Sequence, residues 1–264
     1  MAVFWLDDGT AAAPEGLPRV GRVVMLGGGR RAVVAQGTSA AQIQSTDLLA
    51  EPRKFATANL RSVAREAGGT SAPPNPYVIA WSGSMGEGLF EADPRTWGPR
   101  GWAALHAACD AAAPGLEASR RVLVLRTHAR HVLSDPRACV KFLADRAGGP
   151  FAVLPDAASM IERSMLGMVE DHLDRLFAAL GGAGIVGPLG CVLANVGTDG
   201  PITDGDGALD QPPTVLVPIH AGAVPVGGLI ARWQRHLGAG VPVVLVGAAV
   251  EGQVGALAAC GVGH

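Results

Sequence analysis

Cysteine, lysine and aromatic residues are all scarce in this chain of 264 residues. The four cysteines lie far apart and form no C-x-x-C pair, which argues against a zinc knuckle and against a disulfide framework. This cysteine pattern fits a reducing compartment, and we expect a cytoplasmic protein. Aromatic residues make up 5% of the chain, so we expect a core built mainly from small aliphatic side chains.

Long apolar runs and clusters of one charge are also missing. No segment reaches the roughly 18 uninterrupted apolar residues of a membrane span. The N-terminus turns acidic at Asp7 and Asp8 and lacks the basic start of a signal peptide. Lys54 and Lys141 are the only lysines, and the arginines are scattered along the chain. With a formal net charge of −2, this balance indicates neither a nucleic-acid partner nor an anionic-membrane partner.

What the sequence does contain is a series of short apolar runs, bounded by Gly, Pro and Asp, that predict β-strands. Nine such runs occur, at residues 3–6, 22–26, 32–36, 77–81, 122–125, 151–154, 191–195, 215–219 and 241–246. Helical periodicity is clearest at residues 52–67, 102–113, 136–147, 159–180 and 226–237, and it is weaker at 251–260. From Tyr77 onward strand and helix alternate, which predicts a parallel sheet enclosed by helices.

The fold class that follows is α/β, as one TIM-type (β/α) barrel domain over residues 1–264. A barrel of this type has places for eight strands, and nine candidates compete for them. The two runs that flank residues 27–29, all glycine, are spaced for a hairpin rather than for a helical crossover. We therefore expect the barrel to be irregular in its N-terminal part.

Polar side chains collect at the ends of two neighbouring strands of the predicted sheet. Arg126, Thr127 and His128 follow the run at 122–125, and Asp156 follows the run at 151–154. In a parallel α/β protein the strand interiors are buried on both faces, so the chemistry collects where strands end and loops begin. The segment 121–160 therefore locates the candidate site.

The order of motifs from Tyr77 onward resembles the xylose isomerase-like TIM barrel superfamily, which includes sugar phosphate isomerases and epimerases and related metal-dependent enzymes. The order and spacing of the motifs carry this resemblance over residues 77–247. The motifs are W-S-G at 81–83, V-L-V-L-R-T-H at 122–128, P-F-A-V-L-P-D-A-A-S-M at 150–160, L-V-P-I-H-A-G-A-V-P at 216–225 and V-P-V-V-L-V-G at 241–247.

This resemblance implies a divalent metal, Mn, Mg or Zn, held by a glutamate, an aspartate, a histidine and a second glutamate from successive strand ends. It also implies that the two glutamates move a proton between sugar carbons. In this chain the four positions correspond to Arg126, Asp156, Asn195 and Val246. A guanidinium with a pKa above about 12 cannot act as a base near neutral pH, and it would repel a divalent ion. We therefore expect a degraded metal site and no cofactor.

Arg126 is expected to occupy the space of the lost metal and to pair with Asp156, because neighbouring parallel strands lie about 4.8 Å apart. Two interpretations of this pair remain open. It can form an anion-binding site for a phosphate or a carboxylate, or it can be a structural ion pair that closes an emptied barrel mouth. If catalysis persists, the candidate catalytic residues are Asp156, His128 and Arg126.

The histidines offer a weaker candidate metal site. His128, His131 and His220 could face the barrel mouth together with Asp156, and imidazole with carboxylate suits zinc or iron. The alternative is that these are solvated or helix-capping loop histidines. Further polar residues at predicted strand ends could line a polyol site: Asp7, Asp8, Gln36, Thr38, Ser39, Ser82, Ser84, Asn195 and Asp199.

Three functions remain open at this point. A sugar phosphate isomerase or epimerase with remodelled or metal-free chemistry predicts at least one unpaired acid or base at the strand ends. A pseudoenzyme that binds a small anionic, sugar-like or phosphorylated ligand predicts a polar site without a base, or a mouth plugged by Arg126. A protein-interaction module predicts an exposed apolar patch, for which the helix containing Trp233 is the candidate.

Overall fold

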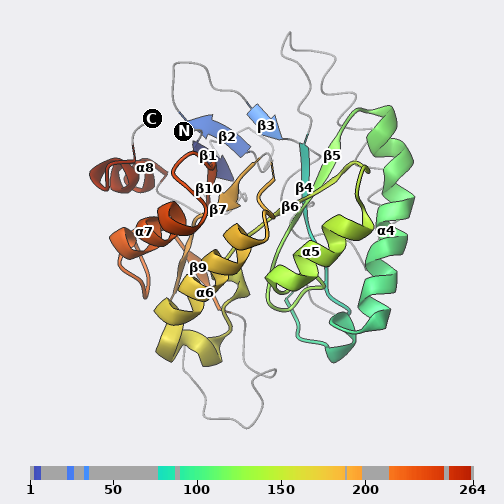
Figure 1. The fold of residues 1–264 in the computed structure, drawn as a ribbon, viewed down its shortest axis with the longest axis horizontal. Coiled ribbons are helices and arrows are strands. Elements are labelled where there is room, and N and C mark those ends of the chain that lie inside the picture. Colours follow the sequence, from blue (N-terminus) through green and yellow to red (C-terminus); the bar gives the residue numbers. More distant parts are fainter. Residues whose placement is uncertain are drawn as a thin grey trace, which may run out of the picture.

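The strands of the protein lie at its centre and the helices lie around them (Figure 1). The computed structural model describes residues 77–86, 90–187, 189–197, 214–246 and 250–262. It also describes the backbone of three short N-terminal strands, β1 (Val3–Leu6), β2 (Val23–Leu26) and β3 (Val33–Ala35). The predicted helix at 52–67 lies outside the described residues.

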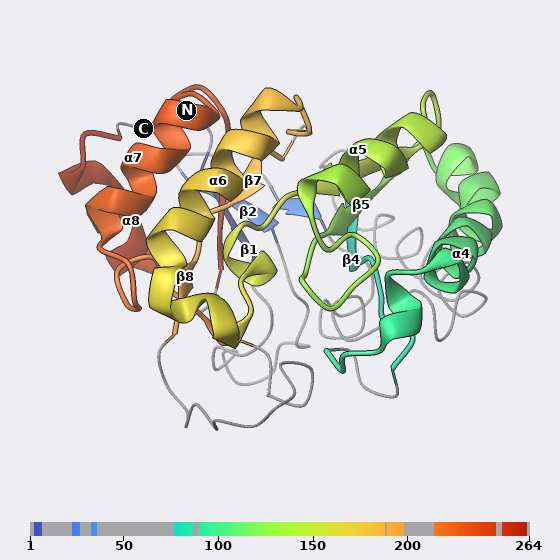
Figure 2. The same cartoon turned by 60° about the horizontal axis from the view of Figure 1, so that its bottom comes forward.

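Strands and helices alternate from β4 onward, as the apolar pattern predicted. The order is β4 (Tyr77–Trp81), α4 (Pro99–Ala118), β5 (Val122–Arg126), α5 (Pro136–Asp145), β6 (Phe151–Leu154), α6 (Val169–Gly182), β7 (Cys191–Val192), α7 (Val226–His236), β10 (Val243–Val246) and α8 (Val250–Ala259). A separate pair, β8 (Asn195–Val196) and β9 (Leu216–Val217), lies between β7 and α7 in the chain and is antiparallel. Helix α6 contacts both α5 and α7, and the three form an outer layer over the strands (Figure 2).

Two parallel sheets meet at the candidate site. Strands β4, β5 and β6 form one of them, in a register that pairs Trp81 with Arg126 and Arg126 with Leu154. Strands β7, β10 and β1 are parallel members of the other sheet. The two sheets are joined by a parallel bridge between Asp156 and Val192. Asp156 thus holds the sheets together through its backbone, while its side chain belongs to the site.

The N-terminal part is irregular, as predicted. Strand β2 is antiparallel to β1 and to β3, so the two runs that flank residues 27–29 pair as expected for a hairpin. Strand β3 contacts β4, but within the described residues no ladder joins the two strands. The described part is therefore a mixed α/β fold with a mostly parallel arrangement of strands, and it does not show a closed barrel.

Two predicted elements are broken in the structure. The predicted strand at 191–195 becomes β7 and β8, because the chain leaves the parallel sheet after Val192 and pairs with β9 from Asn195 onward. The predicted helix at 159–180 starts as two 3-10 helices, η4 (Ala158–Met160) and η5 (Arg163–Met168), before α6 begins. The Ser159 side chain bonds to the main chain in this turn, and such bonds compete with regular helix.

The core lies between the helices and the sheets. Phe142 of α5, Phe177 of α6 and Trp233 of α7 are among its largest buried side chains. Trp233 is fully buried, and none of the exposed large hydrophobic side chains of the described part lies on α7, so the apolar patch expected on this helix is not found there. The large hydrophobic side chains exposed in the described part are Val140, Met168 and Val215. None of the described helices has the length and apolar character needed to cross a membrane.

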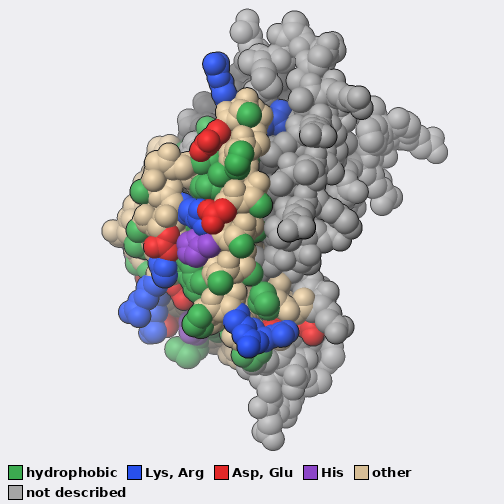
Figure 3. All heavy atoms as spheres, turned by 90° about the vertical axis from the view of Figure 1, so that its right-hand side faces the viewer, with side chains coloured by type: hydrophobic (Ala, Val, Ile, Leu, Met, Phe, Trp, Pro, Cys, Tyr) green, Lys and Arg blue, Asp and Glu red, His purple; other side chains and the backbone are tan. Residues whose placement is uncertain are grey.

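The outer surface of α4 and α5 carries a cluster of charged side chains and a histidine (Figure 3). Arg146 Nε donates to His106 Nδ1 at 3.1 Å, and the same guanidinium pairs with Asp110. Lys141 pairs with Asp145. Exposed ion pairs of this kind contribute little to stability, at most about 1 kcal/mol each. We therefore assign this cluster to the packing of the two helices.

Candidate functional site

Arg126, the last residue of β5, forms an ion pair with Asp156, which lies two residues beyond β6. Arg126 Nε and Nη2 both donate to Oδ2 of Asp156, at 2.9 and 2.7 Å. The side chains are 5% and 0% exposed. The prediction that Arg126 pairs with Asp156 is confirmed. A cation and an anion removed from water in this way are each stabilised by the other.

The remaining acceptor of Asp156 is also engaged. Oδ1 of its carboxylate accepts the main-chain N–H of Ser159 at 3.0 Å. The main chain of Asp156 is held as well, because its N–H donates to Thr127 Oγ1 at 2.9 Å and its carbonyl accepts the Ser159 hydroxyl at 2.9 Å. The carboxylate therefore has its charge balanced and both oxygens hydrogen-bonded by the protein itself.

Trp81 supports the Arg126 guanidinium from β4. The two residues are direct neighbours in the parallel ladder, so their side chains leave the sheet on the same face. The guanidinium carbon lies 4.3 Å from the centroid of the Trp81 ring, which is a cation–π geometry. Within the described residues, Nη1 of Arg126 has no protein acceptor, since both hydrogen bonds of the guanidinium start from Nε and Nη2.

The other two positions at which the sequence resemblance implied metal ligands, Asn195 and Val246, are engaged in holding the fold. Asn195 is buried, donates from Nδ2 to the carbonyls of Ile219 and Val224, and accepts at Oδ1 from the N–H groups of Val196 and Val224. Val246 is apolar and buried, and its carbonyl accepts a bond from Gln253 Nε2 at 2.9 Å. These positions therefore do not fit a divalent ion, because their one carboxylate, Asp156, already faces a fixed cation.

His128 and His131 lie inside an aromatic cluster, not on an open face. His128 is 6% exposed and His131 is 0% exposed. Their ring centroids are 4.9 Å apart, Phe90 lies 4.6 and 5.5 Å from them, and Trp81 meets both edge-on. Burial, together with the nearby charges of His131, Arg126 and Arg130, holds the pKa of His128 well below its usual range.

The weaker candidate metal site does not assemble. His220 is exposed, and its ring lies against Gly252 of α8 rather than beside the two buried histidines. The described residues contain no group of three or more His, Cys, Asp and Glu side chains placed to hold a metal ion. The expectation that His128, His131 and His220 share the mouth with Asp156 is therefore wrong, because packing draws the first two into the aromatic cluster.

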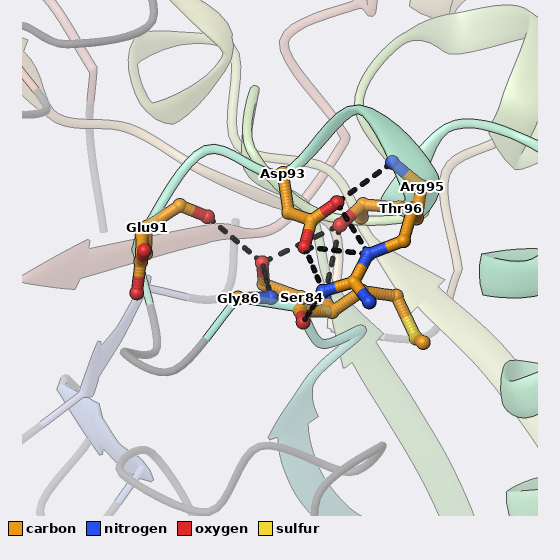
Figure 4. A network of polar contacts seen from close by, with 7 residues as sticks. Ser84, Gly86, Glu91, Asp93, Arg95 and Thr96 are labelled. Atoms are coloured by element: carbon orange, nitrogen blue, oxygen red, sulfur yellow. Dashed lines mark hydrogen bonds and ion pairs between the residues drawn. The ribbon is translucent and has the colours of Figure 1, made fainter.

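The loop that follows β4 is held by its own polar network (Figure 4). Ser84 Oγ donates to the Glu91 carbonyl at 2.8 Å and accepts the Gly86 N–H at 3.1 Å. Thr96 Oγ1 accepts the Met85 N–H at 2.9 Å, and Asp93 caps η3 (Pro94–Thr96). Ser82 is used in the same way, since its hydroxyl accepts the N–H of Leu133.

Both serines thus serve the loops instead of lining a polyol site. The other polar residues expected at strand ends lie outside the described residues, apart from Asn195: Asp7, Asp8, Gln36, Thr38, Ser39 and Asp199.

Several residues of the site were not found from the sequence. Trp81 could have been found, because it ends the strand next to β5 and so stands beside Arg126 in a parallel register. Ser159 had a weaker sequence signal. It lies three residues after Asp156, and an aspartate carboxylate commonly accepts the main-chain N–H of a residue at that distance along the chain. Phe90 and Glu162 had none, because each reaches the site through a loop whose path no local pattern specifies.

Comparison with known proteins finds no matching family model and no matching curated protein. A solved structure of a xylose isomerase domain protein from Planctomyces limnophilus is 13% identical with a TM-score of 0.47, and the match covers 83% of this chain and 67% of that one. A xylose isomerase-like TIM barrel protein from Mycobacterium smegmatis, in complex with magnesium, is 11% identical with a TM-score of 0.46, and the match covers 80% of this chain and 69% of that one. Both structures are described as proteins of the xylose isomerase type, which is the type that the sequence motifs of this chain resemble.

Proposed function

We propose that this chain is a pseudoenzyme of the xylose isomerase-like type, which binds a small anionic or sugar-like ligand without a metal. The observation that carries the proposal is the state of Asp156. Its carboxylate accepts two N–H bonds from Arg126 and one from the main chain of Ser159, so both of its oxygens are hydrogen-bonded by the protein and its charge faces a fixed cation.

Proton transfer between sugar carbons needs an acid or base that can change its protonation state at the reacting atom. At the ends of β4, β5 and β6 the titratable side chains are engaged with other protein groups. Asp156 is paired with Arg126, Glu162 is paired with Arg130, and Nδ1 of His128 accepts the Arg130 N–H. This arrangement supports binding over catalysis.

Arg126 is the residue that we assign to the ligand. Its Nη1 is the part of the guanidinium that Asp156 leaves unused, and a carboxylate, phosphate or hydroxyl oxygen is the acceptor that such N–H groups prefer. Trp81 and Asp156 hold the guanidinium plane in place before a ligand arrives, which reduces the entropy cost of binding.

The test is a thermal-shift and calorimetric screen of sugars, sugar phosphates and small carboxylates, with EDTA and with added Mn²⁺. We expect at least one compound to bind with the same affinity in both conditions. For that compound, NMR in D₂O should show no exchange of carbon-bound hydrogen. Binding that EDTA abolishes, or deuterium incorporation into the ligand, would overturn the proposal.

A second candidate is a purely structural role for the ion pair. The observation that favours it is the aromatic cluster of Trp81, Phe90, His128 and His131, which fills space beside Arg126. In that case no compound of the screen would raise the melting temperature. Replacing Arg126 would then lower stability without changing any binding.

A further inference from the structure

Residues 128–133, here called the β5 cover, form a closed turn after β5. The N–H of His128 donates to the Leu133 carbonyl at 3.2 Å, and the His131 N–H donates to the His128 carbonyl at 3.0 Å. The turn is tied to the loop after β4, because Leu133 N–H donates to Ser82 Oγ and Val132 N–H donates to the Gly83 carbonyl.

The cover is also tied to the loop after β6. Arg130 forms a two-bond pair with Glu162, with Nε and Nη2 at 2.9 and 3.0 Å from the two carboxylate oxygens. Ala129 is held from two sides, since its N–H donates to the Ser159 carbonyl and its own carbonyl accepts Trp97 Nε1. The cover therefore connects the loops that follow β4 and β6, the two strands on either side of β5, and β5 and the loop after β6 carry Arg126 and Asp156.

The imidazole of His128 is buried among the rings of Trp81, Phe90 and His131. Its protonation is disfavoured by burial and by three neighbouring groups, which are His131 in the same turn, Arg126 at the end of β5 and Arg130 in the cover. Both arginines are already matched with a carboxylate, Asp156 and Glu162 respectively. The packed faces belong to Trp81 and Phe90, which carry no charge.

Adding a proton to His128 is strongly disfavoured while the turn stays closed. Nδ1 of His128 accepts the main-chain N–H of Arg130 at 3.1 Å, so the neutral ring carries its hydrogen on Nε2. A second proton must therefore go to Nδ1, where it would face the hydrogen of the Arg130 N–H. Protonation removes this bond and places a charge among cations in a buried cluster.

We propose that the β5 cover is an acid-opened cover over the Arg126–Asp156 pair, with His128 as the residue that takes up the proton. When the cover opens, the His128 ring becomes exposed to water, and the main-chain N–H of Arg130 can form a hydrogen bond with water instead of with Nδ1. The opening itself does not depend on a ligand. The further idea that this opening controls the exchange of a ligand at Arg126 rests on the proposed binding function.

The direction of the pH effect follows from linkage. Because the pKa of His128 is depressed in the closed state and returns toward about 6.5 in the open state, the open state binds more protons. The stability of the closed state relative to the open state is greatest above about pH 6.5, and it decreases as the pH falls below that value. The opening equilibrium is then expected to rise about tenfold for each pH unit below about 6.5.

The experiment is hydrogen–deuterium exchange of the ligand-free chain at pH 7 and pH 5, with rates corrected for intrinsic exchange. We expect the protection of the amides of Arg130, Val132 and Leu133 to fall by more than tenfold at pH 5. The amides of Val124 and Leu125 in β5 should keep their protection. Equal protection of the cover at both pH values, or a simultaneous loss over the whole chain, would overturn the proposal.

Two substitutions of His128 separate its role from mere packing. His128→Asn places an oxygen acceptor near the Nδ1 position and cannot titrate, so its cover should stay closed at pH 5. His128→Gln lacks that acceptor, so its cover should exchange rapidly at both pH values. His106→Gln, at the α4–α5 surface, serves as the control and should respond as the wild type does.

An acid response that persists in His128→Asn would contradict the proposed trigger. The exchange measurement is made without a ligand. Its result therefore tests the acid-opened cover independently of the ligand screen, which tests the proposed function.

Discussion

The guanidinium of Arg126 and the indole of Trp81 occupy matching positions in neighbouring parallel strands, with the guanidinium carbon 4.3 Å from the ring centroid. The arginine is thus bound on one side by an aromatic face and on another by a carboxylate. A lysine could not reproduce this contact, because the planar guanidinium combines stacking with two parallel donors. A permanent positive charge is therefore fixed at the end of β5.

The energetic role of the ion pair can be tested with a double-mutant cycle. Arg126→Met leaves a buried carboxylate without its cation, and we expect it to lower the free energy of unfolding by about 3–5 kcal/mol. Arg126→Met combined with Asp156→Leu removes both charges, so it should be less destabilised than the sum of the single changes. Urea denaturation of Arg126→Met, Asp156→Leu and the double variant measures the three free energies of unfolding that the cycle needs. Additive losses would show that the pair is not coupled.

A glutamate in place of Arg126 should make the fold sensitive to metal. In Arg126→Glu two buried carboxylates face each other, and like charges at this distance disfavour the folded state. A divalent ion would relieve the repulsion, so we expect Mn²⁺ to raise the melting temperature of this variant. Arg126→Gln is the matched control and should not respond. A similar rise in the wild-type protein would contradict the idea that the Arg126 guanidinium keeps a divalent ion away from Asp156.

The cysteines should differ sharply in reactivity. Burial raises the pKa of Cys109 and of Cys139 to about 12, and it also raises the pKa of Cys191. Cys260 is only half-buried. Because the thiolate is the reactive form, we expect Ellman's reagent to modify Cys260 alone in the native protein. Cys260→Ser should then show no rapid reaction, and labelling of a second cysteine before unfolding would refute this.

Gly190 is expected to tolerate no side chain. It has a φ of +76°, and a Cβ at this position would lie 1.8 Å from the carbonyl oxygen of Pro242. Gly190→Ala should therefore lose more than about 2 kcal/mol of unfolding free energy. Gly255 is exposed on α8, and among the described residues no atom lies within 4 Å of the place that its Cβ would take, so Gly255→Ala should gain about 0.5–1 kcal/mol. Thermal unfolding distinguishes the two, and equal effects would contradict the steric explanation.

The strands were predictable because each is defined by its own apolar residues. Strands β4 and β6 occupy the predicted residues, and β5 extends the predicted run by Arg126 alone. The pairing of Arg126 with Asp156 followed from the strand order, since parallel neighbours bring their ends together. The predictions that were wrong depended on partners distant in the chain. The histidines were expected to face the mouth, but Phe90 and Trp81 enclose them from a different loop and a different strand.

Local side-chain pattern was therefore sufficient to place most of the strands, their parallel order from β4 onward and the polar residues that end β5 and follow β6, because burial and alternation act over a few residues. Long-range contacts decided everything that turns those elements into a site. They placed hydrogen-bond donors on both oxygens of the Asp156 carboxylate, buried His128 among aromatic rings close to Arg126 and Arg130, and gave Asn195 three hydrogen bonds to distant main-chain groups. These outcomes depend on how loops pack against one another in three dimensions, and the free energy of that packing is not contained in any single segment.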